Sequence, residues 1–501
     1  MQNINKEFLN YTFMGQLEKF AKDVGLMGIT KVILGLQAFL LLPILTKFLG
    51  ATDFGIWSQI KITVTLLASI SVLSLDTIII RFISGEENKL KISTEFISFL
   101  MLSLSFAIFL GGTIYIFSEK ISFFLTHISN IGFFFKFVVI MIVLQVIYYL
   151  FMTFFRSKEL IKFHSMMELI GVVLEMCLIY ILLLKGYGLI GVISAFILTK
   201  LLLVFIASIN IKKYLLFVKP SFKVIKPYFT FGLPLVFMPV LSILLQISDQ
   251  YIIGYYSGAK AVGIYALAYS LCVIIKLLLD PIYLLLQQTM SKAWNQGDIE
   301  KAKFYFQYSY KYAFMLVIPT MFGLSLLAKP ILKIISTTEF IAGSLLVPII
   351  SLGITLYTFF FLAMILLQLS KKTKRITQIF IMLVVVNILL NFILIPYLGN
   401  LGAALSTLVA FAISAVYGII IIKSMKLDLM WKFLFKSIFA SSVMGTLIIF
   451  LMNLQFLNEI IKIIFVIFSA IIIYFCMLFL LKGIDKYELK FFFSLINYFK
   501  K

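Results

Sequence analysis

The octapeptide GATDFGIW at residues 50–57 returns as GAKAVGIY at residues 258–265, with both glycines, the first alanine and the isoleucine at an offset of 208. A second glycine-rich stretch, GLIG at residues 188–191, aligns with GNLG at residues 399–402 at an offset of 211. Glycine permits the positive φ or the close backbone approach that a tight turn into a helix requires. Two matches at nearly one offset favour an internal repeat. The alternative is that glycine-rich turns simply recur in a membrane protein.

The segments around these turns are too apolar for a soluble domain. Hydrophobic residues make up 62% of the chain and charged residues 13%, whereas about 25% of a typical soluble domain is charged. A run of about 20 apolar residues is long enough to cross a roughly 30 Å hydrocarbon core as a helix. We predict fourteen such spans, at about residues 25–47, 56–80, 95–117, 132–154, 165–184, 188–210, 229–254, 262–288, 309–328, 342–368, 376–395, 400–422, 435–453 and 460–481.

The basic residues between the spans predict the orientation of the chain. The even-numbered loops hold 22 lysines and arginines, and the odd-numbered loops hold 6. Because cytoplasmic loops collect basic residues, the even-numbered loops and both termini are expected in the cytoplasm. The net charge of +22 therefore reflects topology. A nucleic-acid partner is not predicted, since basic residues that bind nucleic acid cluster on one polar face.

Six spans separate the two copies of the repeat, so both copies have the same orientation across the membrane. A pseudo-two-fold axis along the membrane normal would then relate them. We predict an all-α polytopic membrane protein with two six-helix lobes and two extra C-terminal helices. Rocking one lobe against the other would open a central cleft to each side in turn. The expected parts are an amphipathic cytoplasmic segment (1–24), an N-lobe (25–212), a basic cytoplasmic linker (213–228), a C-lobe (229–424), the last helix pair (425–482) and a basic amphipathic cytoplasmic tail (483–501).

The chain lacks the sequence signatures of catalysis. No loop is long enough to fold as a soluble domain, and no HExxH, Walker or GxSxG motif is present. The three cysteines lie far apart inside apolar runs, without the spacing of metal ligands. We therefore predict that the protein is not an enzyme, with no organic cofactor and no metal site.

Two stretches of the second repeat carry a family resemblance. Residues 248–265 (SDQYIIGYYSGAKAVGIY) and residues 387–407, with their Asn387 and Asn391 pair, resemble the polysaccharide and oligosaccharide flippases, which are related to MATE-type exporters and lipid II flippases. Residues 328–332 (AKPIL) also fit. Gln250 departs from the pattern, because a basic residue is common there in the family.

The resemblance implies a function. A flippase of this family would carry an undecaprenyl-pyrophosphate-linked oligosaccharide from the cytoplasmic to the outer leaflet of a bacterial or archaeal cytoplasmic membrane. The product would feed an O-antigen of lipopolysaccharide, a capsule or an exopolysaccharide. The implied partners are the lipid-linked oligosaccharide and membrane lipids, with a glycan polymerase as a candidate contact. A proton or sodium gradient is the candidate driving force.

Ionisable residues inside the spans are the candidate site, because charges at membrane depth are costly and usually face a wet cavity or a partner. We expect four lysines in the cleft to compensate the negative charge of a pyrophosphate, namely Lys31, Lys61, Lys200 and Lys276. The candidates for binding a coupling ion are Glu175, Asp280 and Asp249. Alternatively, Lys276 and Asp280 neutralise each other at i, i+4, and Lys31 and Lys61 extend to the membrane interfaces.

Three other functions fit the composition less well. A MATE-like drug or cation antiporter would favour acidic groups in its cleft, whereas this chain has lysines. A lipid II flippase would share the same architecture. A glycan polymerase or glycosyltransferase would need a sizeable outer loop, which the chain lacks.

Overall fold

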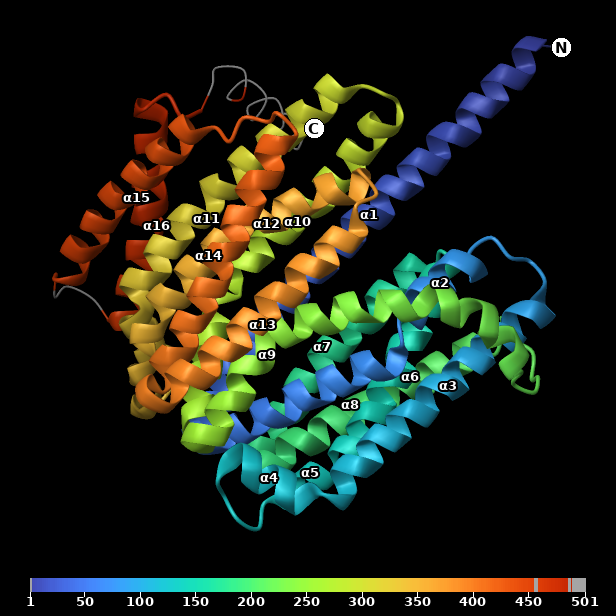
Figure 1. Ribbon diagram of the computed structural model, residues 1–501, viewed down its shortest axis with the longest axis horizontal. Helices are drawn as coiled ribbons and strands as arrows, with labels where there is room; N and C mark the ends of the chain where they lie inside the picture. Colours follow the sequence, from blue (N-terminus) through green and yellow to red (C-terminus); the bar gives the residue numbers. More distant parts are fainter. Residues whose placement is uncertain (1, 455–457, 485–487, 489–501) are drawn as a thin grey trace. The chain divides into compact units, whose positions relative to one another are not determined.

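The computed structural model describes residues 2–454, 458–484 and 488, and in this part of the chain every regular element is a helix (Figure 1). The elements are α1 (Gln2–Val72), α2 (Leu75–Ile83), α3 (Lys89–Ile116), α4 (Ser118–Thr126), α5 (Gly132–Lys136), α6 (Val138–Ser157), α7 (Ile161–Leu184), α8 (Gly188–Ile211), α9 (Phe222–Cys272), α10 (Ile274–Asn295), α11 (Ile299–Ile335), the 3₁₀ helix η1 (Thr338–Leu345), α12 (Leu346–Leu369), α13 (Thr373–Leu398), α14 (Asn400–Ser424), α15 (Trp431–Met452) and α16 (Glu459–Leu480).

The predicted fold class of an all-α polytopic membrane protein is confirmed. Twelve helical segments of the described chain are long and apolar enough to cross a membrane. Segments 39–72 and 237–295 each continue through a glycine bend, and each overlaps two predicted spans. Each of the fourteen predicted spans falls on helix, with short breaks at 73–74, at Phe137 and at Val273.

The chain forms two compact units, Met1–Gly263 and Ile264–Lys501. In the first unit α1, α3, α6, α7 and α8 pack against one another, and in the second α10 to α16 do so (Figure 1). The predicted lobe limits stay predictions. The side chains of residues 1–24 and most of the tail 483–501 lie outside the described residues. The predicted amphipathic character of both segments therefore also stays a prediction.

The repeated octapeptides build the same sharp bend twice. Within α1, Gly50 leaves the helical conformation with φ 69° and ψ −177°, and within α9, Gly258 does so with φ 76° and ψ −179°. A positive φ is open to glycine without the steric cost that a Cβ brings. The first glycine of each octapeptide is therefore the hinge between two membrane-crossing segments.

The second glycine of each octapeptide lets the two bends touch. A methyl group on Gly55 would lie 1.9 Å from the Ala259 carbonyl oxygen, and one on Gly263 would lie 2.0 Å from the Ala51 carbonyl oxygen. The two contacts exchange equivalent positions of the repeat, which is the reciprocity that a local two-fold axis produces. Close backbone approach at small residues is the usual way for helices to associate in lipid.

Replacing Gly55 tests this contact. We expect Gly55→Ala to lower the Tm of the purified full-length protein in detergent, because backbone atoms of both bends would have to move apart. Gly112→Ala in α3 is the matched control, since a methyl group there meets no atom within 4 Å. The control should raise stability by about 0.4–1 kcal/mol. A Gly55→Ala protein that melts like the control would contradict the described packing.

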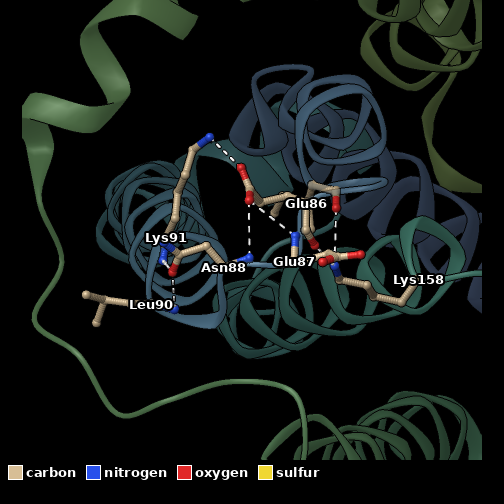
Figure 2. A network of polar contacts seen from close by, with 7 residues as sticks. Glu86, Glu87, Asn88, Leu90, Lys91 and Lys158 are labelled. Atoms are coloured by element: carbon tan, nitrogen blue, oxygen red, sulfur yellow. Dashed lines mark hydrogen bonds and ion pairs between the residues drawn. The ribbon is translucent and has the colours of Figure 1, made fainter.

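Loops predicted to lie in the cytoplasm contact one another. Lys158, directly after α6, donates from Nζ to the carbonyl oxygens of Ile83 at 3.3 Å and Glu86 at 2.8 Å in the α2–α3 loop (Figure 2). The backbone N–H of Leu216, in the predicted linker, donates to Ser93 Oγ at 2.8 Å. Three even-numbered loops therefore lie at one end of the first unit. That this end faces the cytoplasm stays a prediction.

The α2–α3 loop is ordered by its own polar contacts, which Figure 2 shows. Asn88 caps α3, because its Oδ1 accepts from the backbone N–H groups of Leu90 at 3.0 Å and Lys91 at 3.2 Å. The hydrogen bond from Lys91 holds the pKa of the Glu86 carboxyl below its ordinary value. Burial lowers the pKa of the Lys158 ammonium. The contacts fix this loop against the end of α6.

Loops predicted to lie outside also meet. A methyl group on Gly254, near the bend of α9, would lie 2.3 Å from the carbonyl oxygen of Leu125 in α4. In the second unit, Lys333 of α11 pairs with Glu459 of α16 at 2.6 Å. These odd-numbered connections therefore come together at one end of each unit, as the alternating topology requires.

A buried ion pair ties the end of the chain to α11. Lys311 Nζ lies 2.9 Å and 2.8 Å from the two carboxylate oxygens of Glu488, and both side chains are 5% exposed. The Tyr312 hydroxyl donates to the same carboxylate at 3.0 Å. Removing one partner of a buried pair leaves an uncompensated charge, which is costly.

Breaking this pair should therefore destabilise the protein. We expect Glu488→Ala to lower the free energy of unfolding by about 3–5 kcal/mol. Glu459→Ala breaks the exposed pair with Lys333, whose side chains are 59% and 60% exposed, and should cost at most about 1 kcal/mol. Urea titration of both purified variants measures the difference. Equal losses would contradict the buried environment of Lys311.

Candidate functional site

Lys200 lies in α8, in the interior of a predicted span, and is half-buried. Its ammonium group lies 4.3 Å from the centre of the Tyr148 ring of α6 and 5.7 Å from that of Phe196. The face of an aromatic ring attracts a cation most strongly where water is excluded. Tyr148 therefore holds the lysine inside the first unit.

Two carboxylates of α7 complete the surroundings of Lys200. Glu168 and Glu175 both interact electrostatically with it, and so does Lys61 of α1. The Tyr148 hydroxyl donates a hydrogen bond to Glu168 Oε1 at 3.0 Å. We call Lys61, Tyr148, Glu168, Glu175 and Lys200 the charge cluster; it joins α1, α6, α7 and α8. Two predicted site residues, Lys61 and Glu175, are thus within electrostatic range of a third, Lys200, and the Lys61 side chain is exposed.

The charge cluster combines two lysines with two glutamates, and both glutamates interact electrostatically with Lys200. Charges inside a membrane protein need such partners, because the solvation lost on burial costs several kcal/mol for each ion. Lysine carries its charge on a flexible four-carbon stem and can change partner. The arrangement can therefore exchange an internal carboxylate for the phosphate of a ligand, or release a lysine when a carboxylate takes up a proton.

The other predicted residues lie elsewhere. Lys276 of α10 donates to the Tyr269 hydroxyl at 3.3 Å and lies 5.5 Å from the centre of that ring, and Asp280, one turn further on, is exposed. Asp249 is fully buried in α9 beside Ser248. The side chain of Lys31 in α1 is outside the described residues. For all seven predicted residues a functional role stays a prediction.

Gln250, the departure from the family pattern, joins α9 to α1. Its Oε1 accepts from Ser58 Oγ, and its backbone carbonyl accepts from Gln59 Nε2, both at 2.7 Å. One turn along, Thr63 Oγ1 and the Tyr251 hydroxyl lie 3.0 Å apart. A residue with a polar amide therefore stabilises the contact between these two helices next to the glycine bends.

The described residues contain no group of three or more His, Cys, Asp or Glu side chains that could hold a metal ion. The charge cluster has two carboxylates, and both interact electrostatically with Lys200.

Comparison with known proteins places the chain in a family. The family described as "Polysaccharide biosynthesis protein" matches residues 20–286, more than half of the chain, and the MatE family matches residues 234–393. A probable flippase AglR of Haloferax volcanii is 27% identical over 176 residues, which is 34% of this chain and 36% of that protein. A probable low-salt glycan biosynthesis flippase, Agl15, of the same organism is 25% identical over 198 residues, 40% of this chain and 42% of that protein.

These matches span well under half the length of the two curated relatives. Among solved structures, the lipid II flippase MurJ in an inward closed conformation has a TM-score of 0.73 at 17% identity and covers 91% of this chain and 97% of its own. An inward-facing multidrug resistance MATE family transporter of the MOP superfamily has a TM-score of 0.64 at 15% identity, covering 80% and 99%. Such low identities show the fold alone. The chain belongs to the polysaccharide biosynthesis protein family, on the fold shared by MurJ and the MATE transporters.

Proposed function

We propose that this protein is a flippase that moves undecaprenyl-pyrophosphate-linked oligosaccharides from the cytoplasmic to the outer leaflet by alternating access, without catalysis. The observation that carries the proposal is the charge cluster, in which Lys61 and Lys200, from two predicted spans, interact electrostatically within the first unit. The family and the two curated relatives named as flippases support it. The product would enter surface polysaccharide such as an O-antigen, a capsule or lipopolysaccharide.

The pyrophosphate replaces the internal carboxylates during transport. In the empty protein, Glu168 and Glu175 balance the two lysines, so no net charge is left in a low-dielectric environment. An entering pyrophosphate pairs with Lys200 and Lys61, and charge-assisted hydrogen bonds to phosphate are among the strongest in proteins. A proton taken up by a displaced glutamate, or a sodium ion bound there, would couple the exchange to an ion gradient.

The carrier lipid needs an apolar path. In the second unit, a cavity of about 350 Å³ lies among α10, α11, α15 and α16. Its lining is almost entirely apolar and includes Met315, Gly323, Leu327, Ile448 and Ile471. An isoprenoid chain gains about 25 cal/mol per Å² of surface buried from water. This cavity suits part of the undecaprenyl tail.

A lipid II flippase is the alternative that one observation favours, namely the likeness in fold to MurJ. Both cargoes share the undecaprenyl-pyrophosphate carrier, so the charge cluster serves either. A drug or cation antiporter is less well supported, because the lysines of the cluster repel a cationic substrate. The sugar attached to the carrier separates the first two possibilities.

Transport by the reconstituted protein tests the proposal. Lipid-linked oligosaccharide extracted from a strain without this protein is placed in vesicles, and an impermeant lectin measures the glycan that reaches the outer face. We expect Lys200→Gln to lower the initial rate roughly 10- to 100-fold, since one charge-assisted bond to phosphate is lost. Lys212→Gln, at an exposed position after α8, should transport like the wild type. Wild-type vesicles that move lipid II but no oligosaccharide would overturn the choice of cargo.

Filling the apolar cavity tests the lipid path. Gly323 faces open space within 4 Å and lines the cavity, so Gly323→Phe should fold normally and occupy the volume. We expect the variant to lose the preference of the wild type for undecaprenyl over farnesyl carriers in the same assay. Gly112→Phe, also at an open position, is the control. An unchanged preference in Gly323→Phe would exclude this cavity from the path.

A further inference from the structure

The helix of the second predicted span breaks at two residues that are not glycine. Leu73 and Ser74, between α1 and α2, have φ values of 54° and 55°. Non-glycine residues in this left-handed region cost about 1–3 kcal/mol each and cluster at functional sites. Irregular backbone at membrane depth persists only where protein covers it or where it lines a wet cavity. The break therefore calls for a local explanation.

A cavity with one polar wall lies beside the break. It has a volume of about 290 Å³ and is bounded by α1, α2, α6 and α9, all within the first unit. Its polar wall includes Thr65, Ser69, Asp76, Gln145 and Tyr149. These side chains present carboxylate, amide and hydroxyl groups, which can both donate and accept hydrogen bonds.

The carboxylate in this cavity is held in place. The Tyr149 hydroxyl donates to Asp76 Oδ2 at 2.9 Å, and Asp76 lies in the first turn of α2, where the helix dipole favours negative charge. Val72 and Ile243 add apolar surface to the same cavity. One wall is therefore a fixed acceptor, and another is apolar.

We propose that this cavity, bounded by Asp76, Gln145 and Tyr149, binds one hexopyranose unit of the cargo glycan; this rests on the proposed function. A carboxylate and an amide accept and donate to neighbouring ring hydroxyls, while the apolar wall covers the C–H face of the ring. The volume is at the small end for small-molecule sites, which begin at about 300 Å³, and it fits a single sugar. A cation and its ligands would need much less space.

The position of the cavity fits the same cargo molecule. Thr65, at one edge of the cavity, is one turn from Lys61 of the charge cluster and donates to its carbonyl oxygen at 2.8 Å. A helical turn rises about 5.4 Å. A glycan whose pyrophosphate pairs with Lys61 therefore reaches the cavity without leaving this face of α1.

Binding of simple sugars tests the proposal apart from transport. The full-length protein in detergent is titrated with methyl gluco-, galacto-, manno- and N-acetylglucosaminopyranosides, and saturation-transfer NMR detects contact. We expect at least one glycoside to bind the wild type and Asp76→Asn to weaken it roughly 10- to 100-fold. Tyr149→Phe should weaken it less, because the carboxylate stays. Asp428→Asn and Tyr180→Phe, at exposed positions outside the cavity, are the controls.

The outcomes separate this proposal from the transport function. If no glycoside contacts the wild type, or if Asp76→Asn binds as the wild type does, the sugar site is overturned while lectin-measured transport can still proceed. If replacing choline chloride by sodium chloride changes the NMR spectrum of the wild type but not that of Asp76→Asn, and no glycoside binds, the cavity is a cation site and the proposal is wrong. If glycosides bind through Asp76 but the wild type transports nothing, the sugar site stands and the flippase function falls.

Discussion

The hydrocarbon core of a membrane supplies no hydrogen-bond partner and little screening, and the other features of this protein follow from that constraint. Backbone groups must be satisfied within each segment, so the membrane-crossing elements are helices. Two departures from helix are the glycine bend at Gly50 and the break at Leu73 and Ser74 beside the cavity that holds Asp76. Charges are likewise placed against partners, as the Tyr148 ring and Glu168 are placed around Lys200.

The two bends show how a repeated sequence becomes a mechanical element. Gly50 and Gly258 give the chain equivalent turns, and Gly55 and Gly263 let the turns approach through their backbones. A contact made of backbone and small residues has no long side chains to disentangle. In the alternating access that we propose, helices that separate and close again would benefit from such a surface, since little side-chain entropy changes on either step.

Sequence reasoning reached the helices but only part of the site. Spans and bends were predictable because hydrophobic length and glycine pattern are local properties. Lys61, Glu175 and Lys200 stood out as charges in apolar runs, yet Tyr148 gave no signal, since one tyrosine among many has no distinctive spacing. The break at Leu73 was also missed, because Val72-Leu73-Ser74-Leu75 continues an apolar run. Its left-handed backbone depends on packing around the cavity.

The balance of the charge cluster matters more than its basic character. A site built from lysines alone would bind pyrophosphate tightly but stay charged after release, and the empty protein would then resist crossing the low-dielectric states of the cycle. Glu168 and Glu175 interact with Lys200, so in the proposed cycle this lysine has a partner both before and after the cargo binds. The free energy of cargo binding is then the difference between pairing the lysines with phosphate and pairing them with the glutamates. This difference is small enough for the cargo to leave again, which a transporter requires.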